Sequence, residues 1–205
     1  MVAAFVILGS YVLGSLSFAY FAGRLLKGVD LRKVGSGNLG ATNTLRELGT
    51  LPGVIVLLLD VAKGAVAVWL GSTFATDGQW WLVLACGLAA IAGHNWPFYL
   101  QFKGGKGVAT AAGVMLGIFS LPLLCAMAIA LIIIAVTRYV SLGSIIGSFL
   151  LPIFVYLFEM KLSPELWFAV LIAAVVILRH HSNIRRLMNG TEKKLSFKKK
   201  TENGA

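Results

Sequence analysis

The stretch VATAAGVMLGIFSLPLLCAMAIALIIIAV, residues 108–136, decides how the chain folds. It is apolar throughout, and it is longer than the ~20 residues that a helix needs to cross a bilayer. It could therefore form one tilted helix. It could also form two short helices broken at Ser120-Leu121-Pro122, because proline suits a first helical turn and the residue before it leaves the α region. Residues 108–119 are then a candidate half-helix.

Five further apolar segments surround this stretch. They cover residues 2–23, 53–70, 80–91, 142–158 and 165–178. Of the 205 residues, 58% are hydrophobic and 13% are charged, and the mean hydropathy is +0.86. Soluble domains carry roughly 45–50% apolar and about 25% charged residues. The composition therefore excludes a soluble protein and predicts an all-α integral membrane protein, with one membrane domain over residues 1–192.

The basic residues decide between the two interpretations of the central stretch. They gather at residues 24–46, 103–106, 138 and 179–200. One helix gives six spans and places the last cluster opposite the first two, whereas two helices give seven spans and place all four clusters on one face. Because cytoplasmic loops are enriched in Lys and Arg, we expect a seven-transmembrane-helix bundle with its N-terminus outside and its C-terminus cytoplasmic.

The same charge pattern has two further consequences. Residues 193–205 are predicted to form a basic, disordered cytoplasmic tail after the membrane domain. The net charge of +10 lies in clusters that flank apolar segments. Contact with anionic membrane lipid is therefore expected, and nucleic acid is not.

A polar, glycine-rich loop lies between the first two apolar segments. Its glycines let the backbone adopt positive φ and bring bare N–H groups close to a ligand. Strings of such N–H groups bind anions, and an arginine adds a two-pronged hydrogen bond to phosphate or carboxylate. A flexible loop with ordinary turn residues is the alternative. The candidate residues are Gly35, Ser36, Gly37, Asn38, Gly40, Thr42, Asn43 and Arg46.

A second polar stretch, residues 93–107, leads into the central apolar stretch. Glycines and lysines ahead of a helix N-terminus make an anion site from N–H groups, the helix dipole and point charge. The string is not a Walker A loop, because no Gly-x-x-x-x-Gly-Lys-Ser/Thr pattern is present. A basic turn that contacts lipid headgroups is the alternative. The candidate residues are Gly104, Gly105, Lys106 and Gly107.

A third polar stretch, residues 178–187, follows the last apolar segment. If that helix continues, His180 and Asn183 lie three residues apart on one face, and Arg186 lies a further turn on. No carboxylate or cysteine stands at ligand spacing from the histidines, so a metal site is not expected. The alternative is a basic helix on the membrane surface.

Two charged residues lie inside the second apolar segment. At 1.5 Å per residue from Pro52, Asp60 is roughly 10 Å deep and Lys63 roughly 16 Å deep. Charges at such depth usually face the bundle interior and pair with one another. A structural ion pair and a substrate-facing lysine are both open at this point.

Together, these stretches resemble the bacterial membrane family of acyl-phosphate:glycerol-3-phosphate acyltransferases, over nearly the whole chain. The first motif is Gly35-Ser36-Gly37-Asn38-x-Gly40-Ala41-Thr42-Asn43, ending at Arg46. The second is Gly93-His94-x-x-Pro97 with Lys103-Gly104-Gly105-Lys106-Gly107-Val108-Ala109-Thr110. The third is Arg179-His180-x-x-Asn183-Ile184-x-Arg186-Leu187-x-x-Gly190-Thr191-Glu192, and Asp60-x-x-Lys63-Gly64 also matches. Each motif alone is weak, but all of them in order are highly specific.

The resemblance implies an enzyme of phospholipid synthesis. It implies transfer of a fatty acyl group from acyl phosphate to the sn-1 hydroxyl of glycerol 3-phosphate, which gives lysophosphatidic acid and phosphate without a cofactor. It also implies a multi-pass protein of the bacterial plasma membrane with a cytoplasmic active site. A soluble enzyme that supplies the acyl phosphate is an expected partner.

The resemblance also implies roles for individual residues. The expected catalytic residues are Ser36, Lys106, His180 and Asn183. The expected phosphate-binding residues are Gly35, Gly37, Asn38, Gly40, Thr42, Asn43, Arg46, Gly104, Gly105, Gly107 and Arg186. The expected supporting residues are Asp60, Lys63, His94 and Glu192.

The expected mechanism is direct attack of the glycerol hydroxyl on the acyl carbonyl, without an acyl-enzyme. Acyl phosphate is already activated, so holding two substrates together can supply much of the rate. A substrate phosphate oxygen takes the hydroxyl proton, while Ser36 and His180 position the substrates. We expect the acyl tail to lie in a groove beside the second polar stretch, near Trp96, Phe98, Tyr99 and Phe102. An aromatic belt at the membrane interface is the alternative role of these four.

The competing hypothesis is a membrane transporter of an organic phosphate. Such a protein also needs intramembrane charges and anion-binding half-helices. A transporter is expected to have internal repeats and a site at the bilayer midplane. The chain has no convincing repeat, and its polar groups crowd one face. The pattern therefore favours the enzyme.

Overall fold

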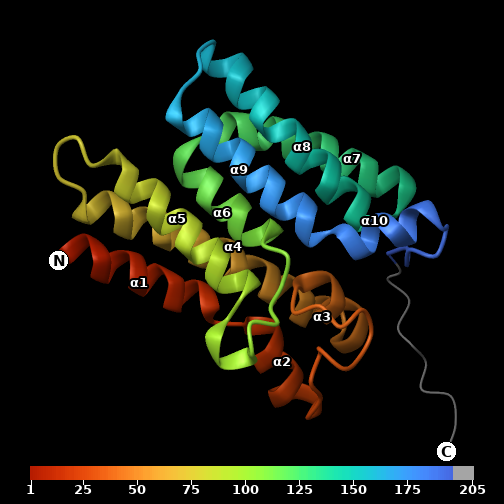
Figure 1. Cartoon of the computed structure of the whole chain (residues 1–205). Helices are drawn as coiled ribbons and strands as arrows, with labels where there is room; N and C mark the ends of the chain where they lie inside the picture. Colours follow the sequence, from red (N-terminus) through yellow and green to blue (C-terminus); the bar gives the residue numbers. More distant parts are fainter. Residues whose placement is uncertain (196–205) are drawn as a thin grey trace, which may run out of the picture.

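The computed structural model describes residues 1–195, which form helices joined by short loops (Figure 1). The helices are α1 (Val2–Ser15), α2 (Phe18–Lys27), α3 (Ala41–Leu48), α4 (Thr50–Phe74), α5 (Trp80–Asn95), the 3₁₀ helix η1 (Phe98–Leu100), α6 (Val108–Ile118), α7 (Ser120–Thr137), α8 (Val140–Glu159), α9 (Pro164–Arg179) and α10 (His181–Met188). Within this part of the chain no residue lies in a β-strand, which confirms the all-α prediction.

Five helical segments are long and apolar enough to cross a membrane. They are Val2–Lys27, Thr50–Phe74, Trp80–Leu100, Ser120–Thr137 and Val140–Glu159. The helices α9 and α10, bent by 58° relative to each other, make a sixth candidate as a pair, and α6 is a shorter apolar helix. The chain is therefore a multi-pass integral membrane protein.

The central apolar stretch forms two helices, α6 and α7, as the proline predicts. The break lies at Phe119, and Pro122 sits in the first turn of α7, where its missing N–H costs no helical hydrogen bond. At 1.5 Å per residue, α6 is about 16 Å long, well short of the ~30 Å hydrocarbon core. The interpretation of residues 108–136 as one helix is wrong.

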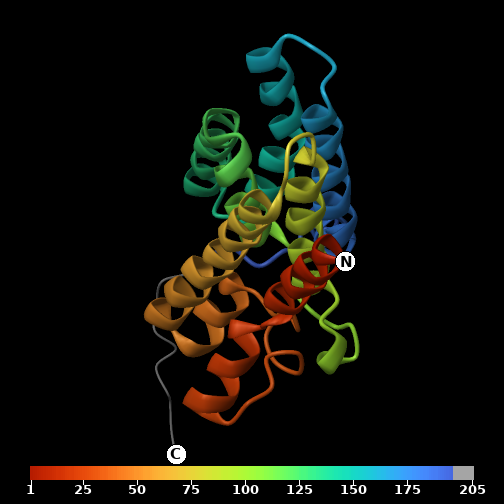
Figure 2. The same cartoon turned by 90° about the vertical axis from the view of Figure 1, so that its left-hand side faces the viewer.

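The helices form two groups that meet at α6 (Figures 1 and 2). In the first group α1 packs on α4 and α5, and α4 also packs on α6. In the second group α8 packs on both α7 and α9. Glycines allow close approach within the first group, because a side chain at Gly14 would overlap the Ala90 backbone and one at Gly113 would overlap the Val61 backbone. A core of buried side chains from α4, α5, α6, α7, α8 and α9 joins the two groups.

Several helix ends differ from the predicted ones. The first apolar segment is two helices, α1 and α2, and the Ser17 side chain caps α2 by accepting a hydrogen bond from the Tyr20 N–H. The second and third segments continue to Phe74 and Asn95. Apolar content marks where a helix enters hydrocarbon, and the hydrogen-bonded helix continues beyond that boundary until a turn or cap stops it.

Two short helices were not predicted as such. Half of the first polar loop is α3, an amphipathic helix that packs on α4. The last polar stretch was expected to continue the preceding helix, but the chain bends by 58° at His180, between α9 and α10. In both helices the fully buried positions are polar, at Asn43 and Thr44 of α3 and at Asn183 of α10. Apolar side chains such as Leu48 of α3 are only partly buried.

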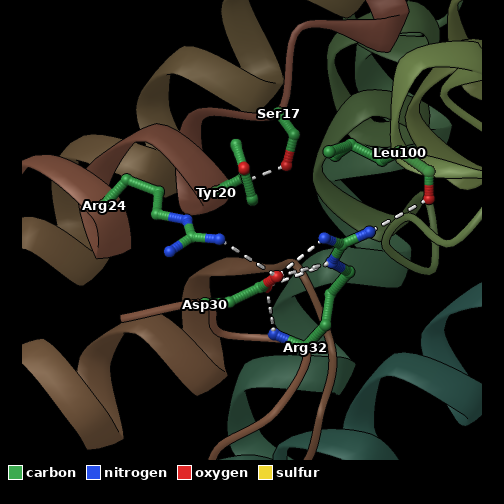
Figure 3. Close-up of polar contacts among 6 residues, drawn as sticks. All are labelled: Ser17, Tyr20, Arg24, Asp30, Arg32 and Leu100. Atoms are coloured by element: carbon green, nitrogen blue, oxygen red, sulfur yellow. Dashed lines mark hydrogen bonds and ion pairs between the residues drawn. The ribbon is translucent and has the colours of Figure 1, made fainter. Parts of the chain in front are cut away.

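A buried carboxylate holds the loop between α2 and α3 in place (Figure 3). Asp30 accepts hydrogen bonds from the Arg32 guanidinium at 2.6 and 3.1 Å, and Arg24 lies at 3.8 Å on its other side. Arg32 also donates to the carbonyl of Leu100 in η1 at 3.2 Å. The hydrogen bonds from Arg32 hold the pKa of Asp30 down, at about 2. This cluster ties the first polar loop to the second.

The chain end is also attached to the helices. The Lys193 carbonyl accepts a hydrogen bond from Arg46 at 2.8 Å. The Leu195 N–H donates to the Arg138 carbonyl at 2.7 Å, and the Arg138 side chain donates back to the Leu195 carbonyl at 2.9 Å. The disordered tail predicted from residue 193 therefore does not begin there, because residues 193–195 are hydrogen-bonded to the domain. Residues 196–205 of that tail lie outside the described residues.

Candidate functional site

A cavity of about 550 Å³ lies between the two groups of helices. Its apolar part is formed by α4, α6, α7 and α8, and its polar part by the three polar stretches. The predicted site residues on its wall are Ser36, Asn38, Gly40, Thr42, Asn43, Arg46, Asp60, His94, Lys106, Gly107, His180, Asn183 and Glu192. Stretches that are far apart in sequence thus contribute to one site.

Two helix N-termini face this cavity without a capping side chain. Gly40 is the N-cap of α3 and Gly107 is the N-cap of α6, and neither can supply a side-chain oxygen. The first N–H groups of a helix have no partner inside the helix, and the helix dipole makes that end positive. Gly107 has φ +82°, a conformation that favours glycine. The arrangement offers two anion-binding sites next to each other.

Lys106 lies beside the N-terminus of α6 and is hydrogen-bonded to α10. Its ammonium donates to the Asn183 side-chain oxygen. Burial lowers the pKa of Lys106 to about 8; nearby Glu192 opposes this shift, and three neighbouring arginines add to it. At neutral pH the ammonium is therefore still charged and can attract a phosphate.

Glu192 gathers the side chains around Lys106. It accepts hydrogen bonds from Asn183 at 2.7 Å, from Ser141 at 2.7 Å and from Arg186 at 2.6 Å. Burial alone would raise the pKa of Glu192, but these hydrogen bonds outweigh burial and leave the pKa below its ordinary value. Its ionised carboxylate fixes Asn183, which in turn orients Lys106.

Arg46 points one edge of its guanidinium at the chain end and keeps another edge free. One terminal nitrogen donates to the Lys193 carbonyl at 2.8 Å. Its Nε atom is buried and has no hydrogen-bond partner among the described residues. An unpaired buried donor is costly. Arg46 as a residue lines the cavity, where its guanidinium charge can attract a phosphate.

The His180 imidazole has a defined orientation. Its Nδ1 lies 2.8 Å from the Val176 carbonyl, and a carbonyl can only accept, so the neutral ring carries its proton on Nδ1. Nε2 is then an acceptor. Asp60 is paired with Lys63, and the described residues show no hydrogen bond from Ser36 to Asp60 or to His180. A Ser-His-Asp arrangement does not form among these residues.

The buried pair in α4 confirms one prediction and resolves an alternative. The Lys63 ammonium lies 2.7 Å from the Asp60 carboxylate, 3.0 Å from His94 Nδ1 and 2.9 Å from the Leu16 carbonyl. These partners occupy its three donors. Lys63 is not part of the cavity wall. The arrangement favours a structural ion pair over a substrate-facing lysine.

Several glycines predicted to bind phosphate have other contacts. The Gly104 and Gly105 N–H groups donate to the Asn95 and His94 carbonyls, and the Gly37 N–H donates to the Val34 carbonyl. The residues expected at phosphate that are absent from the cavity wall are Gly35, Gly37, Gly104, Gly105 and Arg186. The N–H groups of Gly37, Gly104 and Gly105 have backbone partners, and phosphate binding by these residues stays a prediction.

Asn43 and Arg186 also differ from their expected roles. The Asn43 amide donates to the Leu31 and Val34 carbonyls, and its oxygen accepts from the Ser36 N–H. Asn43 therefore fixes the backbone of the first polar loop through its side-chain hydrogen bonds, although it also lines the cavity. Arg186 is paired with Glu192, so it acts on the site through that carboxylate.

The expected position of the acyl groove is wrong. Trp96, Phe98, Tyr99 and Phe102 are absent from the cavity wall. They pack elsewhere: Phe98 lies against Tyr11, Tyr99 stacks on Phe21, and Arg179 lies over Trp96. The apolar part of the cavity is lined by residues that include Leu57, Val61, Ala112, Met127, Leu131 and Leu151. These aliphatic side chains give no local signal that distinguishes them from ordinary lipid-facing residues.

Sequence reasoning missed four residues of the site. Ser141 bonds Glu192, Arg138 holds Leu195, and Leu195 itself lines the cavity. Arg179 belongs to the third motif but was not chosen, and it bonds the second polar stretch. The position of Ser141 directly before an apolar segment could have indicated it, because serines often form hydrogen bonds between membrane helices.

The comparisons with known proteins agree over nearly the whole chain. A family model described as glycerol-3-phosphate acyltransferase matches residues 4–190. The glycerol-3-phosphate acyltransferase of Halalkalibacterium halodurans is 46% identical over 198 residues, which cover 95% of this chain and 96% of the relative. The glycerol-3-phosphate acyltransferase of Shouchella clausii is 49% identical over 197 residues, which cover 94% and 95%.

Solved structures are similar as well. The crystal structure of PlsY, an integral membrane glycerol 3-phosphate acyltransferase, in its glycerol 3-phosphate form has a TM-score of 0.86 and 40% identity, covering 95% of this chain and 96% of that one. Its lysophosphatidic acid form has a TM-score of 0.83 and 39% identity, with the same coverage.

Proposed function

The chain belongs to the glycerol-3-phosphate acyltransferase family, and we propose that it takes its acyl group from acyl phosphate and attaches it to the sn-1 hydroxyl of glycerol 3-phosphate. It is an acyltransferase that makes lysophosphatidic acid. The observation that carries the proposed donor is the pair of uncapped helix N-termini, α3 and α6, in one cavity with Arg46 and Lys106. Two anionic groups fit such a site, and both proposed substrates carry a phosphate.

Each substrate is assigned to one end of the polar region. The acyl phosphate headgroup lies at the N-terminus of α6, where Lys106 balances its charge, and its tail enters the apolar part of the cavity. Glycerol 3-phosphate lies at the N-terminus of α3, where Arg46 lines the cavity and supplies positive charge. This assignment brings the glycerol hydroxyl to the acyl carbonyl between the two phosphates.

The reaction is a direct acyl transfer. The glycerol hydroxyl oxygen attacks the acyl carbonyl carbon, and the bond from that carbon to the phosphate oxygen breaks. A phosphate oxygen takes the hydroxyl proton, so no protein base is required. Lys106 stabilises the negative charge on the departing phosphate. Ser36 and His180 position the substrates, and neither becomes acylated.

Glu192 and its partners support this chemistry without touching the reacting atoms. The carboxylate holds Asn183, and Asn183 holds Lys106. Because the Lys106 ammonium is already in position, little free energy is needed to reorganise the site in the transition state.

The proposed topology has seven spans, with the N-terminus outside and the site on the cytoplasmic face of a bacterial plasma membrane. The five long segments, together with α9 and the short α6, supply seven crossings. The basic clusters then share one side, as cytoplasmic loops do. The membrane domain over residues 1–192 extends at least to Leu195 by the contacts of Arg138. A soluble enzyme that supplies acyl phosphate is the proposed partner on that side.

One assay tests the donor and the stoichiometry. Purified protein in detergent is given palmitoyl phosphate and glycerol 3-phosphate, and phosphate and lysophosphatidic acid are measured together. We expect equal amounts of both products. Product formation from an acyl thioester, with none from acyl phosphate, would overturn the proposed donor.

A second measurement tests direct transfer. The protein is incubated with palmitoyl phosphate alone, and its intact mass is recorded before and after glycerol 3-phosphate is added. We expect no palmitoylated protein. An acyl group found on Ser36 that glycerol 3-phosphate then removes would overturn the direct mechanism.

A further inference from the structure

Gly105, the residue just before Lys106, is held from two sides. Its carbonyl accepts hydrogen bonds from two nitrogens of the Arg179 guanidinium, at 2.8 and 3.2 Å. Its N–H donates to the His94 carbonyl at 3.0 Å. Both polar groups of this peptide segment are therefore fixed, one by α9 and one by the end of α5.

The side chain of His94 also contacts Gly105. A Cβ at Gly105 would overlap the His94 imidazole at Nε2, so the backbone lies directly against the ring. The Gly104 N–H donates to the Asn95 carbonyl at 3.2 Å, and Arg179 reaches that carbonyl at 3.4 Å. The glycines are required here because the chain must approach a side chain and two carbonyls at once.

Both residues that hold Gly105, His94 and Arg179, are themselves fixed by other contacts. The His94 ring is hydrogen-bonded to Lys63 at 3.0 Å, and Lys63 is paired with Asp60 at 2.7 Å, all three being buried. Arg179 lies with its guanidinium carbon 5.5 Å from the centre of the Trp96 ring. A planar guanidinium stacked on a ring and bonded by two nitrogens is held in one orientation.

We propose that Arg179 and His94 are positioning residues that clamp Gly105 and thereby set the place of the Lys106 ammonium. The Asp60–Lys63 pair supports the His94 side of the clamp. This inference rests on the proposed function, because Lys106 is assigned there to the phosphate of the acyl donor. On this inference, Asp60 and Lys63 affect catalysis by holding the loop that carries Lys106, and they do not contact the substrate.

The charge of Arg179 gives this role a second readout. Five charged or titratable side chains from different parts of the fold surround Lys106. They are Glu192, Arg186, Arg179, Arg46 and His180. The positive charge of Arg179 is one of the influences that lower the pKa of Lys106 to about 8, after burial. Removing this charge, or releasing the loop into water, changes the pKa of Lys106 upward in both cases.

The first test measures Lys106 directly, without turnover. The full-length protein in detergent is labelled briefly with acetic anhydride over a range of pH, and acetylation of Lys106 is read by peptide mass spectrometry. We expect a midpoint near pH 8 in the wild type and a midpoint at least half a pH unit higher in Arg179→Gln. The matched control is Arg185→Gln, the same change at an exposed arginine of α10, which we expect to leave the midpoint unchanged.

The second test compares steady-state kinetics for the two substrates. Positioning of Lys106 predicts that Arg179→Gln lowers kcat/KM for acyl phosphate about 10- to 100-fold, while KM for glycerol 3-phosphate changes less than threefold. Arg179→Lys keeps the charge but loses the two-pronged bond to Gly105, so we expect an intermediate kcat/KM and a labelling midpoint between those of the wild type and Arg179→Gln.

The outcomes separate the inference from the proposed function. If Arg179→Gln is folded and matches the wild type in both midpoint and kinetics, the clamp is wrong. If the wild type does not use acyl phosphate but the midpoint shifts as expected, the proposed donor fails and the clamp stands.

A glycine variant keeps the inference testable where Arg179→Gln does not fold. Gly105→Ala pushes the loop from the His94 ring, and we expect the same rise of the Lys106 midpoint and the same loss with acyl phosphate. An unchanged midpoint and unchanged kinetics in Gly105→Ala would overturn the clamp. Thermal unfolding and size-exclusion profiles establish which variants are folded.

Discussion

Lys106 is the buried cation of the site, and its protonation state decides how well the site attracts an anion. Burial, before any neighbouring charge, lowers the pKa of its ammonium to about 8. The group is charged below that pH and neutral above it. A phosphate monoester is already fully ionised there, because its second pKa is about 6. We therefore expect kcat/KM for acyl phosphate to fall about tenfold per pH unit above pH 8.

The variant Lys106→Arg is the control for this pH dependence. A guanidinium stays charged to about pH 12 or beyond, so the decline above pH 8 should disappear even if the rate is lower throughout. Initial rates from pH 6.5 to 9.5 at low acyl phosphate measure both profiles. A decline with a midpoint near 8 that persists in Lys106→Arg would assign the titration to another group.

The residues that sequence could and could not assign differ in a simple physical way. Arg46, Lys106 and His180 have side chains whose chemistry suggests a role wherever they lie, and all three line the cavity. A glycine has no such side chain. Whether its N–H faces a ligand or a carbonyl depends on the path of the loop, so Gly105 was assigned to phosphate although its N–H donates to His94.

The loop between α2 and α3 depends on one buried carboxylate. Asp30 is held by Arg32 and approached by Arg24, and Arg32 carries this contact on to η1. In Asp30→Asn the two arginines lose their anionic partner, and Arg32 loses charge-assisted hydrogen bonds, which contribute about 1.5–3 kcal/mol. We expect a lower melting temperature in detergent. We also expect a higher KM for glycerol 3-phosphate, because α3 follows this loop.

A matched change at the surface separates the loss of the Asp30 contacts from the loss of a charge as such. Lys33→Gln alters an exposed charge three residues further on, and we expect its melting temperature to stay within one or two degrees of the wild type, since exposed charges contribute about 0–1 kcal/mol. Equal melting temperatures for Asp30→Asn and the wild type would show that the Asp30 contacts do not stabilise the loop.

The same element scale explains why α3 was not predicted, whereas a helix at α10 was among the alternatives. Each has only eight residues, and its fully buried side chains are polar, such as Asn43 and Asn183. Over barely two turns, hydrophobic periodicity is a weak indication of a helix. The proline at position 122, by contrast, acts on the backbone directly, and the break beside it was predicted.

The arrangement of the whole molecule follows from the length of one helix. Charge parity required a break in residues 108–136, and α6 and α7 provide that break. The crossings are not visible in composition alone, because α6 is shorter than a normal span and five segments pass the length criterion. Long-range packing places α6 against α4, with further contacts to α5 and α7.

Chemical labelling in cells tests the seven-span arrangement. In a protein whose native Cys86 and Cys125 are replaced by alanine, single cysteines are placed at Asp77, Lys103 and Lys161. A maleimide that cannot cross membranes should label the first and third in intact cells, and Lys103→Cys only after permeabilisation. The turn between α8 and α9 decides the count. If α6 does not cross, this turn lies inside, and Lys161→Cys will be protected in intact cells while Asp77→Cys is labelled.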